Sequence, residues 1–244
     1  MTSHPSEIPI LMYHQIRDSN RNEKLKSLCV SPKSFSMQMH LLKLLGYKGL
    51  SMRKLTPYLK GEKKGKVVGI TFDDGFLNNL QYAAPILHRL EFSSTCYIIS
   101  DLIGSTNIWD KELGAPQVPL MDRREINSWI DHDQDIGCHT ANHLDITTCS
   151  TDILATETLQ SKEKLEKEFQ LKIDDFCYPF GEYKDREKKF IEKCGFKTAV
   201  TTNRSRLAES DDLLELPRVH IFRSTWIHLF LLKVISKYED RRRK

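Results

Sequence analysis

Short apolar runs alternate along the chain with longer segments in which apolar residues recur at helical spacing. The apolar runs are typical of buried strands and comprise Pro9–Tyr13, Val67–Phe72, Ser94–Ile99, Asp135–Cys138, Asp175–Tyr178, Thr198–Thr201 and Leu216–Ile221. The segments with helical periodicity are Ser34–Leu45, Asn79–Leu90, Arg123–Asp131, Thr151–Phe169 and Asp185–Lys193. Strands separated by helices predict a parallel sheet with helical crossovers, either an α/β barrel or an open doubly wound sheet.

Residues with special backbone preferences agree with this alternation. Ser31-Pro32 and Ser150-Thr151-Asp152 are typical helix starts, and Gly46 and Gly195 are typical helix ends. The stretch Ser105–Pro119 contains Gly and Pro without periodicity, which predicts a surface loop near one rim of the sheet. Because no repeat and no Gly/Ser-rich linker divides the chain, we interpret residues 1–244 as a single domain.

Composition narrows the class of protein only slightly. The 244 residues are 39% hydrophobic and 29% charged, which is ordinary for a soluble globular protein. Much of the net charge of +4 lies in Arg241–Lys244, so the sequence predicts no nucleic-acid partner. The six cysteines are scattered and form no Cys-x-x-Cys pair, and the N-terminal residues show no secretory leader. These features lead us to expect a cytoplasmic protein with reduced thiols.

The C-terminal segment 226–244 has a pattern of its own. Residues 226–235 are apolar almost all round a helix, and a basic tail follows them. The apolar part is too short to span a bilayer. Two interpretations are open: a helix packed against the domain with a solvated tail, or peripheral attachment to a membrane surface. Attachment would suit an enzyme that acts on lipid-linked sugars.

Candidate chemistry lies where two of the predicted strands end. Asp73 and Asp74 directly follow Val67–Phe72, and His139 and His143 follow Asp135–Cys138. In parallel α/β folds, functional groups collect at the carboxyl ends of the strands. Imidazoles and a carboxylate are typical ligands of zinc and similar cations. The pattern therefore indicates that one acid binds a metal ion while the other works beside it as a base, although a turn and two unrelated histidines would have the same spacing.

A third candidate is the stretch Cys177-Tyr178-Pro179-Phe180-Gly181, which also follows a predicted strand. Pro and Gly on either side of an aromatic residue favour a tight loop, whose backbone N–H groups could face a substrate. His14 ends the first predicted strand. It is either a hydrogen-bonding group within the site or a histidine with a purely structural role.

These motifs resemble those of the polysaccharide deacetylases, the NodB-homology group that is also called carbohydrate esterase family four. Thr71-Phe72-Asp73-Asp74-Gly75 is similar to the first motif of that family, and His139-Thr140-Ala141-Asn142-His143 to the second. Pro9–His14 resembles the opening strand of the poly-N-acetylglucosamine deacetylase branch, and Ser161-Lys162 with Leu165-Glu166 resembles a helix of that branch. The resemblance implies a single distorted (β/α) barrel with about seven parallel strands.

The resemblance also implies roles for individual residues. Asp74, His139 and His143 would bind a divalent metal ion, for which zinc is our first choice and cobalt, nickel or iron the alternatives. Asp73 would be the general base that helps water attack an acetamide carbonyl. The backbone N–H of Phe180, in the loop Pro179–Gly181, would stabilise the oxyanion.

The chain departs from the family pattern in three places. The third motif usually begins with an Arg that pairs with the base, and Cys177 occupies that position. The usual Asp-Trp fourth motif is not recognisable. The fifth motif, Leu-x-His, has a loose counterpart in Leu216–His220. We infer that Arg218 substitutes for the missing Arg and that His220 is the general acid; the alternatives are a structural ion pair and an ordinary strand histidine.

The sequence thus predicts a metal-dependent hydrolase that removes N-acetyl groups from N-acetylhexosamine units of a glycan or of a lipid-linked glycan precursor. Its partner would be an N-acetylated saccharide. Two alternatives remain at this point. One is a non-catalytic carbohydrate-binding or scaffold protein on the same fold, and the other is a deacylase of a non-sugar amide or an O-acetyl ester.

Overall fold

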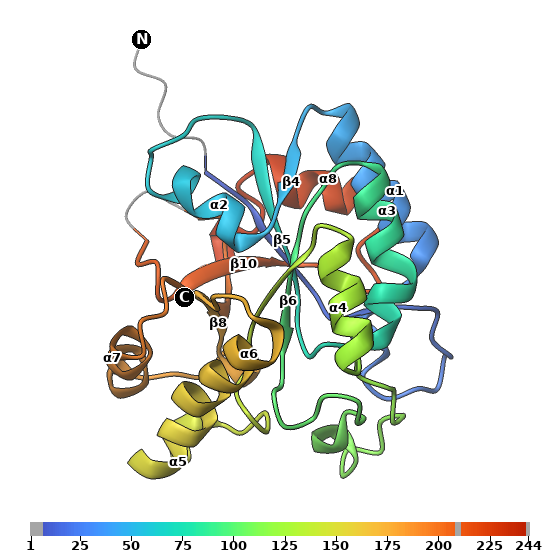
Figure 1. The fold of residues 1–244 in the computed structure, drawn as a ribbon. Helices are drawn as coiled ribbons and strands as arrows, with labels where there is room; N and C mark the ends of the chain where they lie inside the picture. The colour runs from blue at the N-terminus through green and yellow to red at the C-terminus, as the bar shows by residue number, and fades with distance from the viewer. Residues whose placement is uncertain (1–6, 208–210, 243–244) are drawn as a thin grey trace.

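A closed ring of seven parallel strands forms the centre of the computed structural model, which describes residues 7–207 and 211–242 (Figure 1). The ring strands are β1 (Ile10–Tyr13), β5 (Val67–Phe72), β6 (Thr95–Ile98), β7 (Asp135–Cys138), β8 (Asp175–Cys177), β9 (Thr198–Arg204) and β10 (Leu216–His220). Strand β1 pairs with both β5 and β10, which closes the ring. The predicted barrel with about seven parallel strands is therefore confirmed, and the open doubly wound sheet is wrong.

Three short strands lie outside the ring. Strand β4 (Lys48–Leu50) pairs with the first residues of β5, on the same edge that β6 joins further along. Strands β2 (Gln15–Ile16) and β3 (Cys29–Val30) form a separate parallel pair. The sequence analysis predicted none of the three, because runs of two or three residues are too short to show a period.

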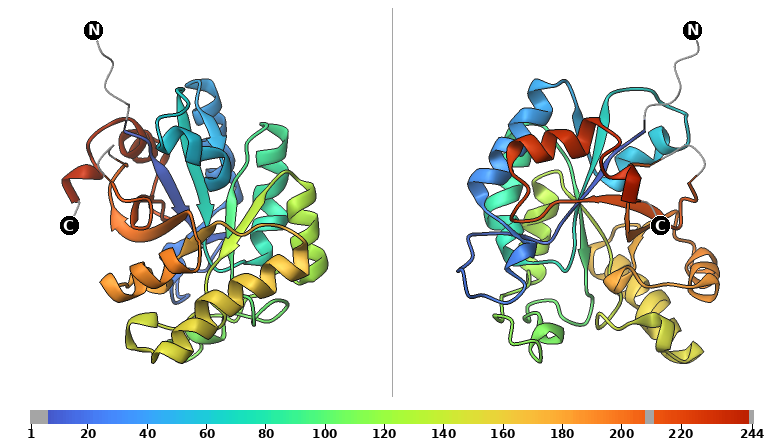
Figure 2. Two further views of the ribbon diagram at one scale, coloured as in Figure 1. Left: turned by 60° about the vertical axis from the view of Figure 1, so that its left-hand side comes forward. Right: turned by 180° about the vertical axis from the view of Figure 1, so that it is seen from behind.

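Helices surround the ring and separate it from solvent (Figures 1 and 2). They are α1 (Pro32–Leu44), α2 (Met52–Leu59), α3 (Ala84–Arg89), α4 (Arg123–Asp131), α5 (Thr151–Ala155), α6 (Ser161–Phe169), α7 (Asp185–Lys193) and α8 (Ile227–Ile235). The 3₁₀ turns are η1 (Lys26–Leu28), η3 (Ile108–Asp110), η4 (Ile146–Thr148), η6 (Pro179–Gly181) and η7 (Asp240–Arg242).

The predicted helix boundaries are confirmed in their physical detail. The Ser31 hydroxyl accepts a hydrogen bond of 3.2 Å from the backbone N–H of Ser34, so it caps α1. The hydroxyl of Ser150 caps α5 in the same way. Gly46 and Gly195 have φ values of 79° and 78°, the left-handed conformation that ends a helix without strain only at glycine.

Two of the predicted helices contain a π-helical turn that periodicity alone did not indicate. Residues Asn79–Ala83 (η2) precede α3, and residues Thr156–Gln160 (η5) lie between α5 and α6. A π turn carries an extra residue and so changes which side chains face inward. Asn79 in η2 and Glu157 in η5 are among the polar residues that are buried there. Each of them hydrogen-bonds to a loop at the rim of the barrel, as the next subsection describes.

Alternation along the strands sorts side chains between the inside of the ring and the layer under the helices. Ile10, Tyr97, Cys177, Val200 and Leu216 belong to the cluster inside the ring. Their neighbours along the strands, such as Leu11, Ile98 and Phe176, pack in the larger cluster beneath the helices. Because all ring strands are parallel, their carboxyl ends meet at one rim, and the residues that follow them form one face of the molecule.

Helix α8 packs beside α1 on the outside of the barrel (Figures 1 and 2). Phe230, Lys233 and Val234 are buried there, whereas Trp226 is 67% exposed. The carboxylate of Glu239 lies 2.6 Å from the ammonium group of Lys233 and 2.9 Å from Nε of Arg204 in β9, so the chain after α8 folds back onto the domain. The last two residues of the predicted basic tail lie outside the described residues, and attachment to a membrane surface stays a prediction.

Among residues 7–207 and 211–242, no helix is both long enough and apolar enough to cross a bilayer.

Candidate functional site

Asp74, His139 and His143 meet at the rim formed by the carboxyl ends of the strands. Asp74 follows β5, His139 directly follows β7, and all three residues are buried. The Oδ1 atom of Asp74 lies 3.3 Å from Nε2 of His139 and 3.5 Å from Nε2 of His143. One donor atom from each residue lies within 4.8 Å of the other two, which is close enough for a single cation to touch all three.

Hydrogen bonding and ring packing fix how the two imidazoles face Asp74. The Nδ1 atom of His139 lies 2.8 Å from the backbone oxygen of Cys177, to which it donates, so the Nε2 side of the ring faces Asp74. The ring of His143 stacks on Trp109 at a centroid distance of 4.6 Å and meets Phe180 edge-on at 4.6 Å. Packing between two aromatic rings, rather than a hydrogen bond to Nδ1, therefore orients His143.

A buried carboxylate holds the loop that carries the two histidines. Oε2 of Glu157 accepts hydrogen bonds from the backbone N–H groups of Ala141 and Asn142, at 3.2 and 2.9 Å. Its other oxygen accepts from the side chain of Asn142 at 2.9 Å. The loop also contains two non-glycine residues with positive φ, Thr140 at 65° and His143 at 60°. Such conformations persist only where the surroundings determine them, and Glu157 supplies that constraint.

The electrostatics of the three residues suit a cation. Burial and the charge of His139 lower the pKa of His143 to about 3, so this imidazole is neutral and offers a lone pair. Burial raises the pKa of the Asp74 carboxyl, but hydrogen bonding to His139 and the proximity of His143 outweigh it, and the net shift is downward. An ionised carboxylate and two imidazole nitrogens form the donor set typical of a zinc-like ion in a catalytic site. The three residues therefore fit a divalent metal ion.

Asp73 faces the interior of the barrel and pairs with Arg218 of β10. The guanidinium donates to both carboxylate oxygens, from Nη1 to Oδ1 at 2.6 Å and from Nη2 to Oδ2 at 2.8 Å. Arg218 is fully buried, and its Nε donates to the backbone oxygen of Thr201 at 2.8 Å. Burial raises the pKa of Asp73, but the charge and hydrogen bonds of Arg218 outweigh it and hold that pKa well below its usual range. Asp73 is thus an ionised carboxylate next to the candidate metal ligands.

Arg218 supplies the cation beside Asp73 that the family pattern would place at position 177. Nη2 of Arg218 lies 3.5 Å from the thiol sulfur of Cys177, so the guanidinium occupies the space in front of that side chain. A cation therefore reaches Asp73 from β10, whereas in the family pattern it would come from the end of β8.

The two other candidate histidines differ in what they touch. His14, after β1, has its Nε2 atom 3.9 Å from Oδ2 of Asp73. The backbone oxygen of His14 accepts a hydrogen bond of 2.7 Å from the amide of Asn79, which fixes this part of the rim. His220 instead donates from Nε2 to the backbone oxygen of Thr202 at 2.8 Å. Burial and the charge of Arg218 lower the pKa of His220 to about 3, so its ring is neutral.

The loop Pro179–Gly181 lies at the same rim, as its place after β8 predicts. Phe180 has φ of 59° and is 53% exposed, with its ring against His143. Gly181 has φ of 77°, and a Cβ atom there would lie 2.0 Å from Oγ1 of Thr202. Only glycine therefore allows this turn, which places the backbone of Phe180 beside the candidate metal ligands.

Three residues of the site escaped the sequence analysis. Trp109 lies in the segment that we predicted as a rim loop, and an aromatic residue within a polar loop was the available signal. Glu157 and Asn79 are buried polar residues within two of the predicted helices, and a polar residue at an inward helical position was the signal in each case. The π turns hid this signal because they shift the helical register.

Comparisons with known proteins agree with these motifs. The sequence profile of the family described as polysaccharide deacetylase matches residues 60–199. YxkH of Bacillus subtilis, which carries a provisional polysaccharide deacetylase name, is 29% identical over 222 residues, 90% of this chain and 73% of that protein. The poly-β-1,6-N-acetyl-D-glucosamine N-deacetylase of Staphylococcus aureus is 24% identical over 235 residues, 90% of this chain and 80% of the enzyme.

A solved structure with a similar fold also has related sequence. The deacetylase PplD of Streptococcus pyogenes, determined in complex with acetate, superposes with a TM-score of 0.82 and is 28% identical. The match covers 93% of this chain and 97% of that one.

Proposed function

Since the chain belongs to the polysaccharide deacetylase family, we propose that it hydrolyses the acetamide of N-acetylhexosamine units in a glycan or in a lipid-linked glycan precursor, with the help of a divalent metal ion. The single observation that carries the proposal is the ionised Asp73 beside the cluster of Asp74, His139 and His143. A carboxylate that pairs with Arg218 and is not one of the three clustered residues, yet lies next to them in the chain, is what a hydrolase needs as a base.

The alternative of a non-catalytic binding or scaffold protein loses its main support. That alternative rested on the missing Arg at Cys177 and on the missing fourth motif. The first mattered more, because a base without its cationic partner would be poorly held. Arg218 pairs with Asp73 through two hydrogen bonds and is fully buried. Burying a guanidinium and a carboxylate is costly unless they are paired, and a protein that only binds a sugar has no use for the pair.

Asp74, His139 and His143 would hold the metal ion, and zinc is the first candidate because two imidazoles and a carboxylate suit it. When bound, such an ion supplies Lewis acidity, which lowers the pKa of a water ligand and polarises a carbonyl. Cobalt, nickel and iron remain candidates, since their ligand preferences overlap.

Side chains and one backbone N–H group of the chain have the other roles in the proposed hydrolysis. Asp73 accepts a proton from the attacking water, and Arg218 keeps its carboxylate ionised and fixed in orientation. The backbone N–H of Phe180 donates to the oxyanion that develops from the acetamide oxygen. Trp109 and Phe180 hold the ring of His143 between them and limit the access of bulk water.

The leaving amine needs a proton, and the geometry favours His14 over His220 as its source. Nε2 of His14 lies 3.9 Å from Asp73, so a substrate that reaches Asp73 also lies next to His14. The single proton of the neutral His220 ring is already donated to Thr202. We therefore assign the general acid to His14 and a structural role to His220, which reverses our sequence-based preference.

Acetate release from N-acetylated saccharides tests the proposed function. Chito-oligosaccharides and oligomers of β-1,6-linked N-acetylglucosamine are suitable substrates, since a relative carries the name of a deacetylase of the second polymer. We expect release with added zinc or cobalt, none after chelation, and none with Asp73→Asn. Release of acetate from acetylated non-sugar amides or O-acetyl esters alone would support the third alternative instead.

A further inference from the structure

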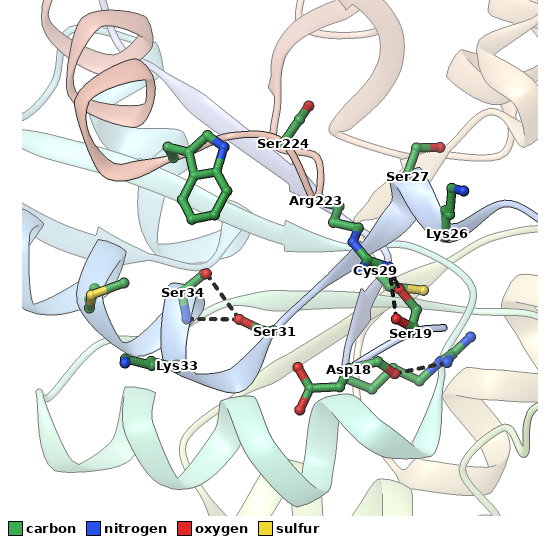
Figure 3. A pocket seen from close by; sticks show the side chains of 13 residues that line it. Asp18, Ser19, Lys26, Ser27, Cys29, Ser31, Lys33, Ser34, Arg223 and Ser224 are labelled. Atoms are coloured by element: carbon green, nitrogen blue, oxygen red, sulfur yellow. Dashed lines mark hydrogen bonds between the residues drawn. The ribbon is translucent and has the colours of Figure 1, made fainter. Parts of the chain in front are cut away.

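A second pocket lies beside the candidate active site, and no step of the proposed reaction uses it. It has a volume of about 800 Å³ and is bounded by the loop after β2, the first turn of α1 and the residues that precede α8 (Figure 3). Clefts of roughly 300–1,000 Å³ are the usual size of small-molecule sites. The pocket could therefore hold one or two sugar units.

Basic side chains predominate in the lining of this pocket. Arg17, Lys26, Lys33 and Arg223 line it, and Asp18 is its one acidic residue. In Figure 3, Lys33 lies on one side of the pocket, Lys26 on the opposite side, and Arg223 between them. An array of cations on several sides of a hollow favours an anionic ligand such as a phosphate or a carboxylate.

Internal contacts leave part of this charge available to a ligand. Arg17 pairs with Glu23, and Nη1 of Arg223 donates to the backbone oxygen of Ser19 at 2.8 Å. Lys26 donates to the backbone oxygen of Arg21, which does not neutralise its charge. Lys33 is exposed, and among the described residues it has no hydrogen bond or ion pair. The lining thus sets one acid, Asp18, against four cations, of which Arg17 is paired with Glu23.

The remaining lining residues suit a sugar better than a bare anion. Five serines line the pocket, and their hydroxyls can donate and accept hydrogen bonds. Trp226 lies at its edge and is 67% exposed, so one face of the indole is free to cover the apolar face of a sugar ring. A combination of hydroxyls, an aromatic ring and cations matches a sugar that carries a negative charge.

The pocket shares one lining residue with a crevice that reaches the metal-binding cluster. Arg17 lines this pocket and also a small crevice that reaches Asp74 and Asp110. Both hollows open among loops that follow the carboxyl ends of ring strands, so they belong to the same face of the barrel. One extended glycan could occupy both.

We propose that this pocket is an accessory subsite that binds an anionic sugar unit, one bearing a phosphate or a carboxylate, of the same glycan whose N-acetyl group is removed. The assignment rests on the proposed function as far as the glycan is concerned, while binding in the pocket can be measured without turnover. It also explains why exposed Trp226 and unpaired Lys33 face the same hollow, although they come from opposite ends of the chain.

Calorimetric titration of metal-free protein with N-acetylglucosamine 1-phosphate tests the subsite. Removal of the metal prevents the phosphate from binding at Asp74, His139 and His143. We expect the phosphorylated sugar to bind and unmodified N-acetylglucosamine to bind at least about tenfold more weakly. Lys33→Ala and Trp226→Ala should each weaken binding roughly three- to tenfold, because each removes one group that contacts the ligand.

Two controls separate the subsite from general effects. Lys60→Ala removes an exposed lysine at the end of α2, outside the pocket, and should leave the affinity unchanged. Acetate release from neutral chito-oligosaccharides should also be unchanged in Lys60→Ala. If the wild-type protein binds the sugar phosphate but releases no acetate from N-acetylated saccharides, the proposed function is rejected and the subsite is retained.

Other outcomes would overturn the subsite. Equal affinity of wild type and both pocket variants would show that the sugar phosphate binds elsewhere. Inorganic phosphate that binds as tightly as the sugar phosphate would remove the sugar from the assignment. If Trp226→Ala and Lys33→Ala lose binding to phosphatidylserine vesicles but keep their affinity for the sugar phosphate, this surface serves membrane attachment instead.

Discussion

Arg218 and Asp73, which are 145 positions apart in the chain, form a bidentate ion pair inside the barrel. The pair joins β10 to the residue after β5 across the ring, and both side chains are buried. The guanidinium keeps the carboxylate ionised and fixes both of its oxygens, directly before Asp74 of the candidate metal cluster. The relationship gives the strongest single reason to regard the site as catalytic.

Replacement of Arg218 should damage both stability and turnover. Arg218→Gln leaves the buried Asp73 without its counter-charge, and we expect a loss of about 3–5 kcal/mol in the free energy of unfolding. The turnover number should fall by at least about 100-fold, because the base is no longer ionised and oriented. Urea denaturation measures the loss of stability, and acetate release measures the loss of turnover. Arg218→Lys keeps the charge but not the two parallel hydrogen bonds, so both of its values should lie between those of wild type and Arg218→Gln.

Cys177 offers a matched test of the same idea. Its thiol lies 3.5 Å from Nη2 of Arg218, so an arginine at position 177 could place its guanidinium where that of Arg218 now lies. We expect the double variant Cys177→Arg with Arg218→Ala to recover part of the activity that Arg218→Ala loses. Cys177→Arg alone crowds two cations into one space and should be destabilised. No recovery in a folded double variant would mean that Arg218 does more than pair with Asp73.

The proposed base and the proposed ligands should separate experimentally. Asp73→Asn removes the proton acceptor but none of the three metal donors, so turnover should fall by about 100- to 10,000-fold while metal content stays near that of wild type. His139→Ala removes a donor and should lose both metal and activity. Elemental analysis of the purified variants, beside acetate release, distinguishes the two classes. Full activity in Asp73→Asn would contradict the mechanism.

Much of this site could be predicted from sequence because its signals are local. Asp73 and Asp74 directly follow an apolar run, and the histidines directly follow another, so the parallel arrangement alone brings them to one rim. The ring itself was predictable for the same reason, since its strands contain short apolar runs, of which Ile10–Tyr13 and Val67–Phe72 are the clearest.

The partners that hold the site together are not local in sequence. The pairing of Arg218 with Asp73 depends on which side of β10 faces inward, and the sequence offered it only as a hypothesis. Glu157 and Asn79 reach the rim through π turns, which no helical period indicates. Trp109 lies in an aperiodic loop whose path depends on contacts made after folding. Long-range contacts of this kind need the three-dimensional structure.

His14 and His220 can be distinguished by the leaving group of the substrate. An amide needs a proton on its departing nitrogen, whereas the phenolate of p-nitrophenyl acetate leaves without one. If His14 is the general acid, His14→Gln should lower amide hydrolysis by about 100-fold or more and lower ester hydrolysis only slightly. His220→Gln keeps a donor for Thr202 and should change both rates by less than about fivefold. The opposite ranking of the two variants would return the acid role to His220.

Glu157 should matter for metal affinity although it is not a metal ligand. It accepts three hydrogen bonds from Ala141 and Asn142, in the middle of the loop between the two histidines. Glu157→Ala frees this loop, and we expect metal affinity to fall about 10- to 100-fold. A competition titration with a chromophoric chelator measures the change. Glu182→Ala, at an exposed position next to the Pro179–Gly181 loop, is a comparison variant that should keep the affinity of wild type.

Asp175 should make stability depend on pH at the end of the barrel opposite to the metal cluster. It begins β8, is buried, and accepts a hydrogen bond of 2.6 Å from Thr198. Burial, with the charge of Asp135 added, raises the pKa of its carboxyl to about 7, although the bond from Thr198 acts in the opposite direction. Between the unfolded pKa near 3.8 and the folded value, the folded protein binds more protons than the unfolded chain. The free energy of unfolding must therefore fall as the pH rises through that interval.

Asp175→Asn removes this pH dependence, because the amide cannot ionise and its oxygen can still accept from Thr198. Relative to wild type, the variant should gain on the order of 1–3 kcal/mol in unfolding free energy between pH 5 and pH 8. Urea denaturation at several pH values measures the difference. Asp133→Asn removes an exposed carboxylate that pairs with Lys54, and its difference from wild type should be nearly constant over the same range. A constant difference for Asp175→Asn would mean instead that Asp175 is ionised in the folded protein at every pH tested, and that its burial is compensated by charges such as Arg53, which already pairs with Asp135.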